Sequence, residues 1–277
     1  MAAKTYLVTG GNTGIGKAIA SELARQGRRV AIVSRDPAKG AAAVDEIRAA
    51  SGNQHISLIP GDLGSIAGAN RLADRILDEC PDLGALINNA GVWMTERVIT
   101  ADGLELSFMV NHLAPVILST RLLDRLRANA PARIVAVNAG LYPQGRLDLA
   151  RTPYGQDFRR MGTYATTKLF NVLAMLELAR QVEGSGVTVN LIHPGVIRTQ
   201  LGASSGPLGA LLRLAKRFWK TPEEGARGPV RLATAPELEM VNGQYFNECE
   251  PIPLAEIAQD RLLSRQVWQQ AIELTRG

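Results

Sequence analysis

Two side chains whose types and spacing could support proton transfer are Tyr164 and Lys168. On an α-helix, residues at this spacing lie on one face, one turn apart. A free tyrosine has a pKa near ~10 and is a poor base at neutral pH. A neighbouring ammonium favours the phenolate and brings that pKa toward the working range of an enzyme. The pair therefore predicts acid–base chemistry, although an isolated pair of this kind is more often a surface contact.

A glycine-rich segment follows the first apolar run and reads Thr9-Gly10-Gly11-Asn12-Thr13-Gly14-Ile15-Gly16. Glycines let the backbone turn tightly and approach a pyrophosphate, and a helix beginning near Gly14 points its N-terminal amides at that anion. Because the segment follows a strand and opens a helix, it predicts a dinucleotide site rather than a structural turn. The expected cofactor contacts here are Gly10, Asn12, Thr13, Gly14, Ile15 and Gly16.

The end of the second apolar run bears on the choice of cofactor. An NAD site commonly has an acidic residue about 20 residues after the glycines, where it accepts from the ribose 2′-hydroxyl. Here the strand is followed by Ser34 and Arg35, and an arginine can form a forked contact with a 2′-phosphate. Asp36 is expected to cap the next helix, with Pro37 at its first position. The sequence favours NADP(H), and the alternative is that Arg35 is an ordinary exposed arginine.

The elements that must position these residues alternate regularly. Short apolar runs, each closed by Gly, Asn, Asp or Pro, have the pattern of buried parallel strands. Between them lie longer amphipathic stretches that read as helices, closed by glycine or proline. The runs are 6–8, 30–33, 56–59, 85–87, 133–137 and 187–192, and the first helical stretches are 17–26, 39–50 and 65–80. This alternation predicts a single-domain α/β Rossmann fold, a doubly wound parallel sheet of about seven strands with helices on both faces.

Composition excludes several classes of function. The chain has 277 residues, 46% of them hydrophobic, which suits one domain with a large core. The net charge of +5 is modest, and without a basic stripe it argues against nucleic-acid binding. The two cysteines and three histidines are scattered, so neither a metal site nor a disulfide framework is expected. With no room for a signal peptide before the first strand and no apolar run of about 18–20 residues, the protein is expected to be cytoplasmic, without a stable membrane anchor.

Two stretches interrupt the alternation after strand ends, at the edge where open α/β sheets bind ligands. Residues 141–160 are rich in Gly, Pro, Arg and Asp and are expected to form a substrate insertion. Residues 201–220 contain a Gly/Ser/Pro segment and a basic amphipathic helix, expected to form a lid. A membrane-surface contact and a contact with a large apolar substrate are the alternatives for that helix. The domain is thus expected to be a single NADP(H)-binding unit over 1–277, with Trp93 and Met94 also bounding its pocket.

Taken in order, the motifs of the chain resemble those of the short-chain dehydrogenase/reductase family over nearly the whole length. The glycine segment matches TGxxxGxG, Tyr164 and Lys168 match YxxxK, and Asn111 falls at the helix-kinking asparagine of the family. The remaining matches are Asp62-Leu63, Asn88-Asn89-Ala90-Gly91 and Pro194-Gly195. The segments 11–17, 34–36, 111–113, 193–196 and 243–246 further resemble the retinol-dehydrogenase-like branch. Because the membrane-bound members of that branch have an N-terminal anchor that we do not expect in this protein, retinoid activity is not carried over.

The resemblance implies a role for each matching residue. Tyr164 would exchange a proton with the substrate oxygen, Lys168 would also bond the nicotinamide ribose, and Asn111 would hold a water that relays protons. Asp62 and Leu63 would lie at the adenine, and the segment Asn89, Ala90 and Gly91 at the cofactor. Pro194, Gly195, Ile197 and Thr199 would lie near the nicotinamide. The family also implies a homodimer or a homotetramer built through its fourth and fifth helices.

One member of the catalytic set of the family is missing. Its serine usually stands second in a Val-Ser-Ser run, whereas this chain has Val137-Asn138-Ala139. Ala139 therefore occupies the serine position and cannot donate a hydrogen bond to the substrate oxygen. Loss of such a donor typically lowers the rate by ~10²–10³ when nothing replaces it. The replacement candidates are Asn138, Tyr142 and Gln144, whereas His112 and His193 are expected to be structural.

Three functions follow from this substitution. The first is an NADP(H)-dependent oxidoreductase that interconverts a carbonyl and an alcohol on a hydrophobic or aromatic small molecule, with a substitute donor. The second is a redox-neutral tailoring enzyme that performs an elimination, cyclisation or rearrangement. The third is a catalytically impaired cofactor-binding protein. The Ala-, Gly-, Arg- and Leu-rich composition suits a GC-rich bacterial genome, and with it a role in secondary metabolism.

Overall fold

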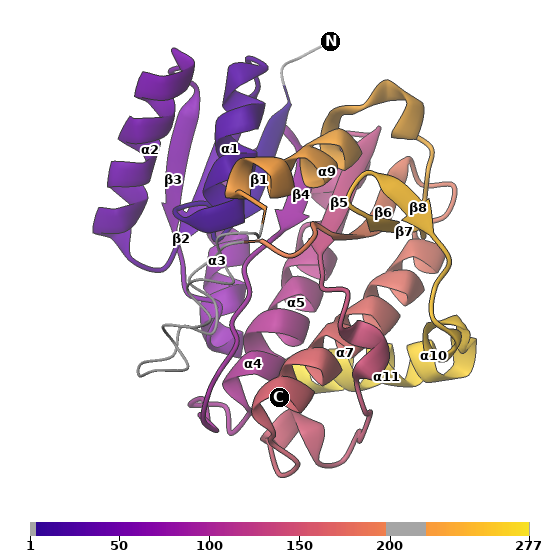
Figure 1. Ribbon diagram of the computed structural model, residues 1–277. Helices are drawn as coiled ribbons and strands as arrows, with labels where there is room; N and C mark the ends of the chain where they lie inside the picture. The colour runs from indigo at the N-terminus through magenta and orange to yellow at the C-terminus, as the bar shows by residue number, and fades with distance from the viewer. Residues whose placement is uncertain (1–3, 198–219, 277) are drawn as a thin grey trace.

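One mixed sheet forms the centre of the molecule (Figure 1). The computed structural model describes residues 4–197 and 220–276. Its eight strands follow the order β3-β2-β1-β4-β5-β6-β7-β8, and every neighbouring pair is parallel except β7 with β8. The strands are β1 (Thr5–Thr9), β2 (Arg29–Ser34), β3 (Ile56–Pro60), β4 (Leu83–Asn88), β5 (Ala132–Val137), β6 (Val187–His193), β7 (Tyr245–Asn247) and β8 (Glu250–Ile252). The predicted parallel sheet is confirmed, with the short antiparallel β8 added at its edge.

Helices cover both faces of the sheet, as a doubly wound fold requires. Helices α1, α2 and α9 pack on one face, and α3, α5 and α7 pack on the other, with α11 against α7 (Figure 1). The helices are α1 (Gly14–Arg25), α2 (Pro37–Ser51), α3 (Ile66–Glu79), α4 (Leu106–Phe108), α5 (Ala114–Arg121), α6 (Leu123–Ala128), α7 (Arg160–Gln181), α9 (Pro222–Thr234), α10 (Glu256–Gln259) and α11 (Arg261–Arg276). None of these helices is both long and apolar enough to span a bilayer.

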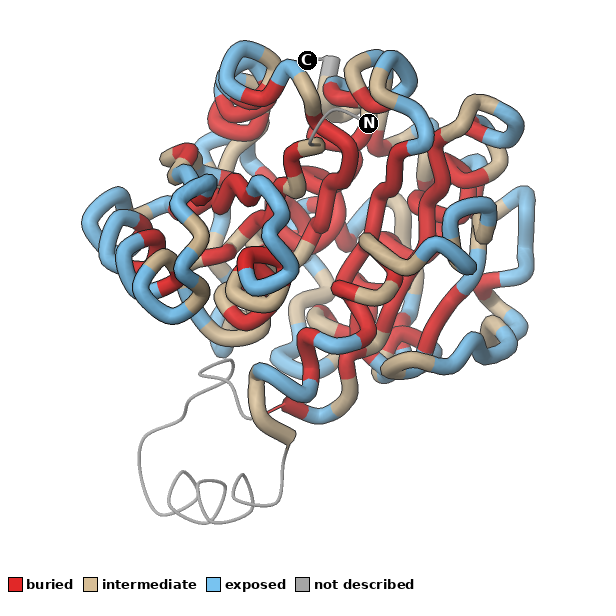
Figure 2. Tube along the Cα trace, turned by 90° about the horizontal axis from the view of Figure 1, so that it is seen from above, coloured by how far each residue is buried: buried red, intermediate tan, exposed pale blue. Residues whose placement is uncertain are grey.

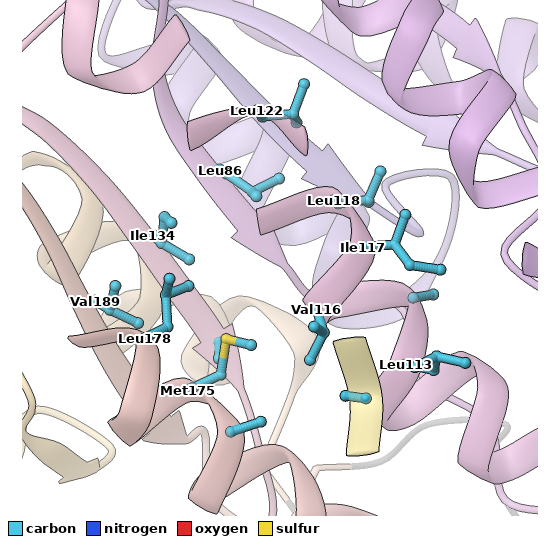
Figure 3. Close-up of a cluster of buried hydrophobic side chains, with 14 of the residues drawn as sticks. Leu86, Leu113, Val116, Ile117, Leu118, Leu122, Ile134, Met175, Leu178 and Val189 are labelled. Carbon is cyan, nitrogen blue, oxygen red and sulfur yellow. The ribbon is translucent and has the colours of Figure 1, made fainter. Parts of the chain in front are cut away.

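The core lies in the two layers between the sheet and its helices. Every residue of β4 and β5 is buried, because both strands are covered on both faces (Figure 2). Alternate side chains of β5 enter opposite layers: Ile134 packs toward α5 and α7, and Val135 packs toward α9. Figure 3 shows the first of these layers, where Met175 and Leu178 lie near Ile134 and Val189 of the strands. The helix α7 is therefore fixed along the sheet by apolar contacts.

Local signals set several helix ends. Asp36 accepts hydrogen bonds from the amides of Ala38 and Lys39, Pro37 is the first residue of α2, and Gly52 ends the helix with φ of 72°. This is the capping by Asp36 that the sequence predicts. Ser65 caps α3 in the same way through the amide of Gly68. These caps fix where each strand–helix connection leaves the sheet.

The carboxyl ends of the parallel strands lie at one edge of the sheet. From β1 the chain adds β2 and β3 on one side and then β4 and β5 on the other side, so the strand order reverses at β1. The connection after β1 therefore lies at the topological switch point, where open α/β sheets bind ligands. The expected insertion 141–160 follows β5 at the same edge and contains two 3₁₀ turns, Tyr142–Gln144 and Thr152–Tyr154. Apart from Lys220, the expected lid 201–220 lies outside the described residues.

Candidate active site

The glycine segment after β1 forms a tight turn packed against its neighbours. Gly10 and Gly14 have φ of 64° and 55°, values that favour glycine. A Cβ on Gly16 would lie 2.2 Å from the carbonyl oxygen of Gly10, so only hydrogen fits there. This glycine closes the helix onto the turn.

The start of α1 has the properties of an anion cradle. Thr13 is the N-cap residue, yet its side chain makes no capping hydrogen bond, and the first turn of α1 contains no acidic residue. The amides of that turn are therefore uncapped donors at the positive end of the helix. Asn12, Thr13 and Ile15 lie on this turn, as expected. The turn thus has the backbone conformation and the donors that a pyrophosphate needs.

The segment after β4 is tied to the glycine segment. The Thr9 hydroxyl accepts hydrogen bonds from the amides of Asn89 (2.9 Å) and Ala90 (3.0 Å). The Asn89 side chain donates to the Thr9 carbonyl at 2.8 Å. Asn89, Ala90 and Gly91 therefore lie beside the predicted pyrophosphate turn, at the same sheet edge.

The end of β2 presents Arg35 to solvent. The Ser34 hydroxyl donates to the Asp36 carbonyl at 2.8 Å, and the Asp36 carboxylate caps α2. Both side chains are therefore engaged in local hydrogen bonds, whereas Arg35 is exposed and pairs with no carboxylate among the described residues. At the end of β3, Asp62 bonds the amide of Gly64 and Leu63 is 8% exposed.

Asn111 lies in an irregular helical turn. Residues Met109–Leu113 form a π-helical turn between α4 and α5, a distortion that is frequent at functional sites. The Asn111 amide accepts from the amide of Val92 at 2.8 Å and donates to its carbonyl at 2.9 Å. It also donates to the Thr167 hydroxyl on α7 at 3.1 Å. Asn111 therefore fastens the segment after Gly91 to the helix that carries Lys168.

Lys168 reaches the same place from α7. Its side chain is buried, and Nζ donates to the Val137 carbonyl at 3.2 Å. A Cβ on Gly91 would lie 3.3 Å from Asn111 Oδ1 and 3.5 Å from Lys168 Nζ, so glycine at this position leaves the space between them open. Burial lowers the pKa of Lys168 to about 8.

Tyr164 lies one turn before Lys168, whose Nζ is 5.8 Å from the centroid of the tyrosine ring. Burial raises the pKa of Tyr164 to about 12. The expectation that the ammonium lowers this pKa is therefore wrong for the protein alone, because desolvation of the phenolate dominates. The phenol keeps its proton at neutral pH, which is the form needed to protonate a carbonyl oxygen.

Trp93 contributes to the covering of Tyr164, a role that its position after the Asn89–Gly91 segment does not reveal. The two rings stack with centroids 5.5 Å apart and planes at 28°. The Trp93 indole donates to the Arg160 carbonyl at 2.9 Å, and Arg160 Nε donates to the Thr95 carbonyl at 2.7 Å. These two hydrogen bonds connect the segment after β4 to the start of α7 and hold the Trp93 ring over the Tyr164 ring.

Ala139, which the resemblance places at the serine position of the family, follows β5, and the candidate replacement donors differ in how accessible they are. The Asn138 amide donates to the Lys168 carbonyl at 3.2 Å and to Asn171 Oδ1 at 3.0 Å. The Tyr142 hydroxyl accepts from the amide of Ala255 at 2.8 Å, and this side chain is 3% exposed. Gln144 is exposed on the insertion. Both amide donors of Asn138 are thus engaged, and the Tyr142 hydroxyl is closed off by burial rather than by a hydrogen bond that it donates.

The connection after β6 lies at the same edge of the sheet as the segments after β1, β4 and β5. Gly195 has φ of 92°, and Ile197 forms an isolated bridge with Lys220. Pro194 and Gly195 therefore turn the chain at the carboxyl end of β6, next to β5. Thr199, the last expected cofactor contact, lies outside the described residues.

The fold and this edge define a doubly wound α/β protein with a tyrosine–lysine pair beside a dinucleotide-type turn. The model of the short chain dehydrogenase family matches residues 4–207. The chain therefore belongs to the short chain dehydrogenase family, in its retinol-dehydrogenase-like branch.

Relatives of known name support this membership. Human retinol dehydrogenase 14 is 38% identical over 97% of this chain and 85% of its own length. Human retinol dehydrogenase 12 is 38% identical over 98% of this chain and 86% of its own. A short chain dehydrogenase from Burkholderia cenocepacia, solved with NADP, is 28% identical with a TM-score of 0.70, covering 88% of this chain and 96% of its own. The Pseudomonas aeruginosa RhlG/NADP complex is 26% identical with a TM-score of 0.71, covering 89% and 95%.

Proposed function

We propose that this protein is an NADP(H)-dependent oxidoreductase that interconverts a carbonyl and an alcohol on a hydrophobic small molecule. The observation that carries the proposal is the position of the Tyr164 phenol, one helical turn from the buried Lys168 and at the sheet edge of the glycine turn. Membership of the short chain dehydrogenase family supports an oxidoreductase, and relatives solved with NADP support the cofactor class.

Tyr164, Lys168 and Asn111 each have a separate role in the proposed reaction. When bound, NADP(H) supplies or accepts the hydride. Tyr164 donates the proton of its hydroxyl to the carbonyl oxygen in reduction and takes it back in oxidation. The Lys168 ammonium stabilises the phenolate left behind, because opposite charges in a buried site attract strongly. Asn111 fixes the segment after Gly91 against α7 and so keeps the lysine beside the cofactor turn.

Apolar side chains on Tyr164 and elsewhere at the same sheet edge support a hydrophobic substrate. Trp93 stacks on the tyrosine, and Met161, one turn earlier on α7, is 48% exposed. Val196, after the turn that follows β6, is 58% exposed. Large apolar side chains left in water at a ligand-binding edge favour an apolar ligand over a charged one.

A variant at Tyr164 tests the reaction. Tyr164→Phe keeps the ring that stacks on Trp93 but removes the proton donor. We expect NADPH oxidation with a panel of cyclic and aromatic ketones to fall by about 10²–10⁴-fold, the usual contribution of general acid catalysis. NADPH binding, measured by cofactor fluorescence, should be unchanged. Turnover by Tyr164→Phe at the wild-type rate would contradict the proposal.

Arg35 is proposed to select NADP(H) by pairing with the 2′-phosphate. Loss of a charge-assisted contact worth roughly 1.5–3 kcal/mol should raise the Kd for NADPH about 10- to 100-fold in Arg35→Ser. The Kd for NADH should change little, because NADH has no 2′-phosphate. Arg28→Ser, at the opposite end of β2, is the matched control. Equal weakening of both cofactors in Arg35→Ser would rule out this role.

A redox-neutral reaction is the second candidate, and the specific observation that favours it is Ala139. With no hydroxyl at that position and with Asn138 engaged elsewhere, a substrate oxygen has one donor fewer than in the pattern of the family. A product formed without change in cofactor absorbance, at a rate unaffected by Tyr164→Phe, would support this candidate. NADPH binding with no product from any substrate would instead indicate a cofactor-binding protein.

A further inference from the structure

Glu248 has a backbone conformation that is unusual for its side chain. Its φ is 59°, and every other residue with positive φ in the described part of the chain is a glycine. The left-handed region is unfavourable for a residue with a Cβ, and residues held there gather at functional sites. The contacts of Glu248 therefore bear on why a glutamate stands at this position.

The turn that contains Glu248 lies at the ligand-binding edge of the sheet. Strand β7 runs parallel to β6, with His193 opposite Asn247, so Glu248 follows the carboxyl end of β7. Glu248 and Cys249 connect Asn247 to its antiparallel partner Glu250 on β8. Two-residue turns of this kind favour Gly, Asn or Asp at positive φ. The geometry of the turn thus does not explain a glutamate at its first position.

Helix α9 holds this turn in place. A Cβ on Gly228 would lie 2.1 Å from the Glu248 carbonyl oxygen, so the helix packs directly on the peptide of the turn. Arg231, on the same helix, donates to the Cys249 carbonyl at 2.9 Å. A strained conformation persists only where its surroundings determine it in this way. The backbone of Glu248 is therefore fixed by α9 as well as by the sheet.

The contacts of Glu248 converge on the connection after β6. Its amide donates to the His193 carbonyl at 2.7 Å. Its carboxylate pairs with the Lys220 ammonium, and a Cβ on Gly195 would lie 3.0 Å from Glu248 Oε1. The carboxylate therefore lies against Gly195, whose φ of 92° favours glycine.

Lys220 contacts the same connection. Its amide donates to the Val196 carbonyl at 3.1 Å, and it forms the isolated bridge with Ile197. Its Cδ would lie 3.5 Å from a Cβ on Gly195. Because the ion pair joins Lys220 to Glu248, the two residues together hold the connection by two backbone hydrogen bonds and by side chains packed on its glycine.

The connection after β6 lies between the glycine turn and the tyrosine–lysine pair. A Cβ on Gly225 would lie 2.7 Å from Ile197 Cδ1 and 3.7 Å from Ile15 Cγ1, so Ile197 is close to the first turn of α1. Lys168 Nζ donates to the Val137 carbonyl at the end of β5, the strand beside β6. A dinucleotide that extends from the glycine turn to the tyrosine–lysine pair must therefore pass this connection.

We propose that Glu248 is a positioning residue for the nicotinamide of the bound cofactor. From the β7–β8 turn it fixes the connection after β6, where Pro194, Gly195 and Ile197 are expected near the nicotinamide, and so keeps the ring aligned for hydride transfer. The inference rests on the proposed NADP(H)-dependent carbonyl–alcohol chemistry. The strain at Glu248 is then the consequence of placing a carboxylate in this turn.

Two substitutions separate the carboxylate from the strain. Glu248→Ala removes the carboxylate and keeps the strain, whereas Glu248→Gly removes both. We expect kcat for ketone reduction to fall about 10- to 100-fold in each, because a misplacement of about 1 Å can have an effect of this size. The Kd for NADPH should change less than about 3-fold, because the glycine turn and Arg35 provide most of the affinity. Glu248→Gln, whose amide can still accept from Lys220, should retain more activity.

The stability of the cofactor-free variants distinguishes positioning from a purely structural role. Glycine adopts φ of 59° freely, so the Tm of Glu248→Gly should exceed that of Glu248→Ala by about 2–4 °C. A structural role would let kcat follow Tm, and the glycine variant would then recover activity. A positioning role leaves both variants slow, because neither has the carboxylate.

The complex with NADPH alone provides a readout without turnover. The emission of NADPH comes from its reduced nicotinamide ring, so its lifetime and anisotropy report how firmly the ring is held. We expect a shorter lifetime and a lower anisotropy for NADPH bound to Glu248→Ala than for NADPH bound to the native protein. Glu250→Ala is the matched control, because Glu250 is exposed and lies in the same hairpin. It should show native emission and native kcat.

Three results would count against these proposals. Native emission of NADPH in Glu248→Ala, or native kcat in Glu248→Gly, would overturn the role of Glu248 while leaving carbonyl reduction intact. An equal loss in Glu250→Ala would also overturn it, because the effect would then belong to the hairpin as a whole. Absence of ketone reduction by the native protein would refute the proposed function, whereas the emission of bound NADPH would still decide whether Glu248 holds the nicotinamide.

Discussion

At the scale of single residues, the site is governed by how burial changes the ionisation of two side chains. Tyr164 keeps its proton because burial raises its pKa to about 12, and Lys168 loses its proton more easily because burial lowers its pKa to about 8. Near neutral pH the pair is therefore a neutral phenol beside an ammonium. This combination suits donation of a proton to a carbonyl, the reductive direction.

A pH profile tests this ionisation. The ammonium of Lys168 is present below pH about 8 and is lost above it. We therefore expect kcat/KM for ketone reduction to fall as pH rises from 8 to 9, approaching ten-fold per pH unit once the lysine is neutral. Lys168→Met should give a low rate without this fall. A rate that holds steady through pH 9 in the native protein would contradict the assignment.

The free energy of unfolding should gain a contribution from Lys168 over the pH interval in which kcat/KM falls. The pKa of Lys168 is lower in the folded chain than in the unfolded chain, so between about pH 8 and the ordinary lysine value the unfolded chain binds more protons. The contribution of Lys168 therefore stabilises the folded state as pH rises through this window. A falling rate without a falling Tm between pH 8 and 9 separates loss of the catalytic charge from unfolding.

Residue types and spacing predict the pair Tyr164 and Lys168, because local sequence places both on one helix face, whereas Asn111 is predicted only by the resemblance to the family. The pKa of Tyr164 could not be predicted in this way. Its covering includes Trp93, which is distant in sequence and reaches the tyrosine through a hydrogen bond to Arg160. The same holds for His193, whose place beside Gly140 depends on the register of two strands.

At the scale of elements, the glycine turn and α1 act as one unit. A Cβ on Gly16 would meet the Gly10 carbonyl at 2.2 Å and the Asn89 amide at 2.4 Å, contacts that no real Cβ makes. Gly16→Ala must therefore displace backbone. We expect a loss of about 1–3 kcal/mol in the free energy of unfolding, as for other overpacked sites, together with weaker NADPH binding.

Thermal unfolding and fluorescence titration check this prediction. Gly162→Ala, in the first turn of α7, is the matched control, because a Cβ there would meet the side chain of Arg159 at 3.3 Å rather than backbone. Its Tm should stay close to that of the native protein, and its Kd for NADPH should be unchanged. A Gly16→Ala protein that binds NADPH with native affinity would show that close packing of α1 on the turn is dispensable.

Element boundaries were predictable where a side chain caps its own helix. Asp36, Pro37 and Gly52 bound α2 as their types indicate, since the capping contacts are local. The short β8 and the 3₁₀ turns of the insertion were not predictable. Residues Glu250–Ile252 are exposed and lack an alternating pattern, and they become a strand only because β7 lies beside them.

At the scale of the whole molecule, apolar strands between two helical layers explain why the architecture could be read from the sequence. The runs that are buried on both faces are those with continuous apolar residues, as in β4 and β5. The assembly of the family, a dimer or tetramer, and a place in secondary metabolism stay predictions. They depend on partners and substrates that the pattern of one chain does not specify.

The central claim is that the whole edge, from the glycine turn to Tyr164 and the end of β6, carries out hydride and proton addition to a carbonyl. The most direct measurement is the mass of the product formed from the ketone panel with NADPH carrying deuterium at its transferable position. The account predicts a product that has gained one deuterium on carbon and one proton on oxygen, and none from Tyr164→Phe. A product of unchanged mass, or one that has lost water, formed equally well by Tyr164→Phe, would contradict it.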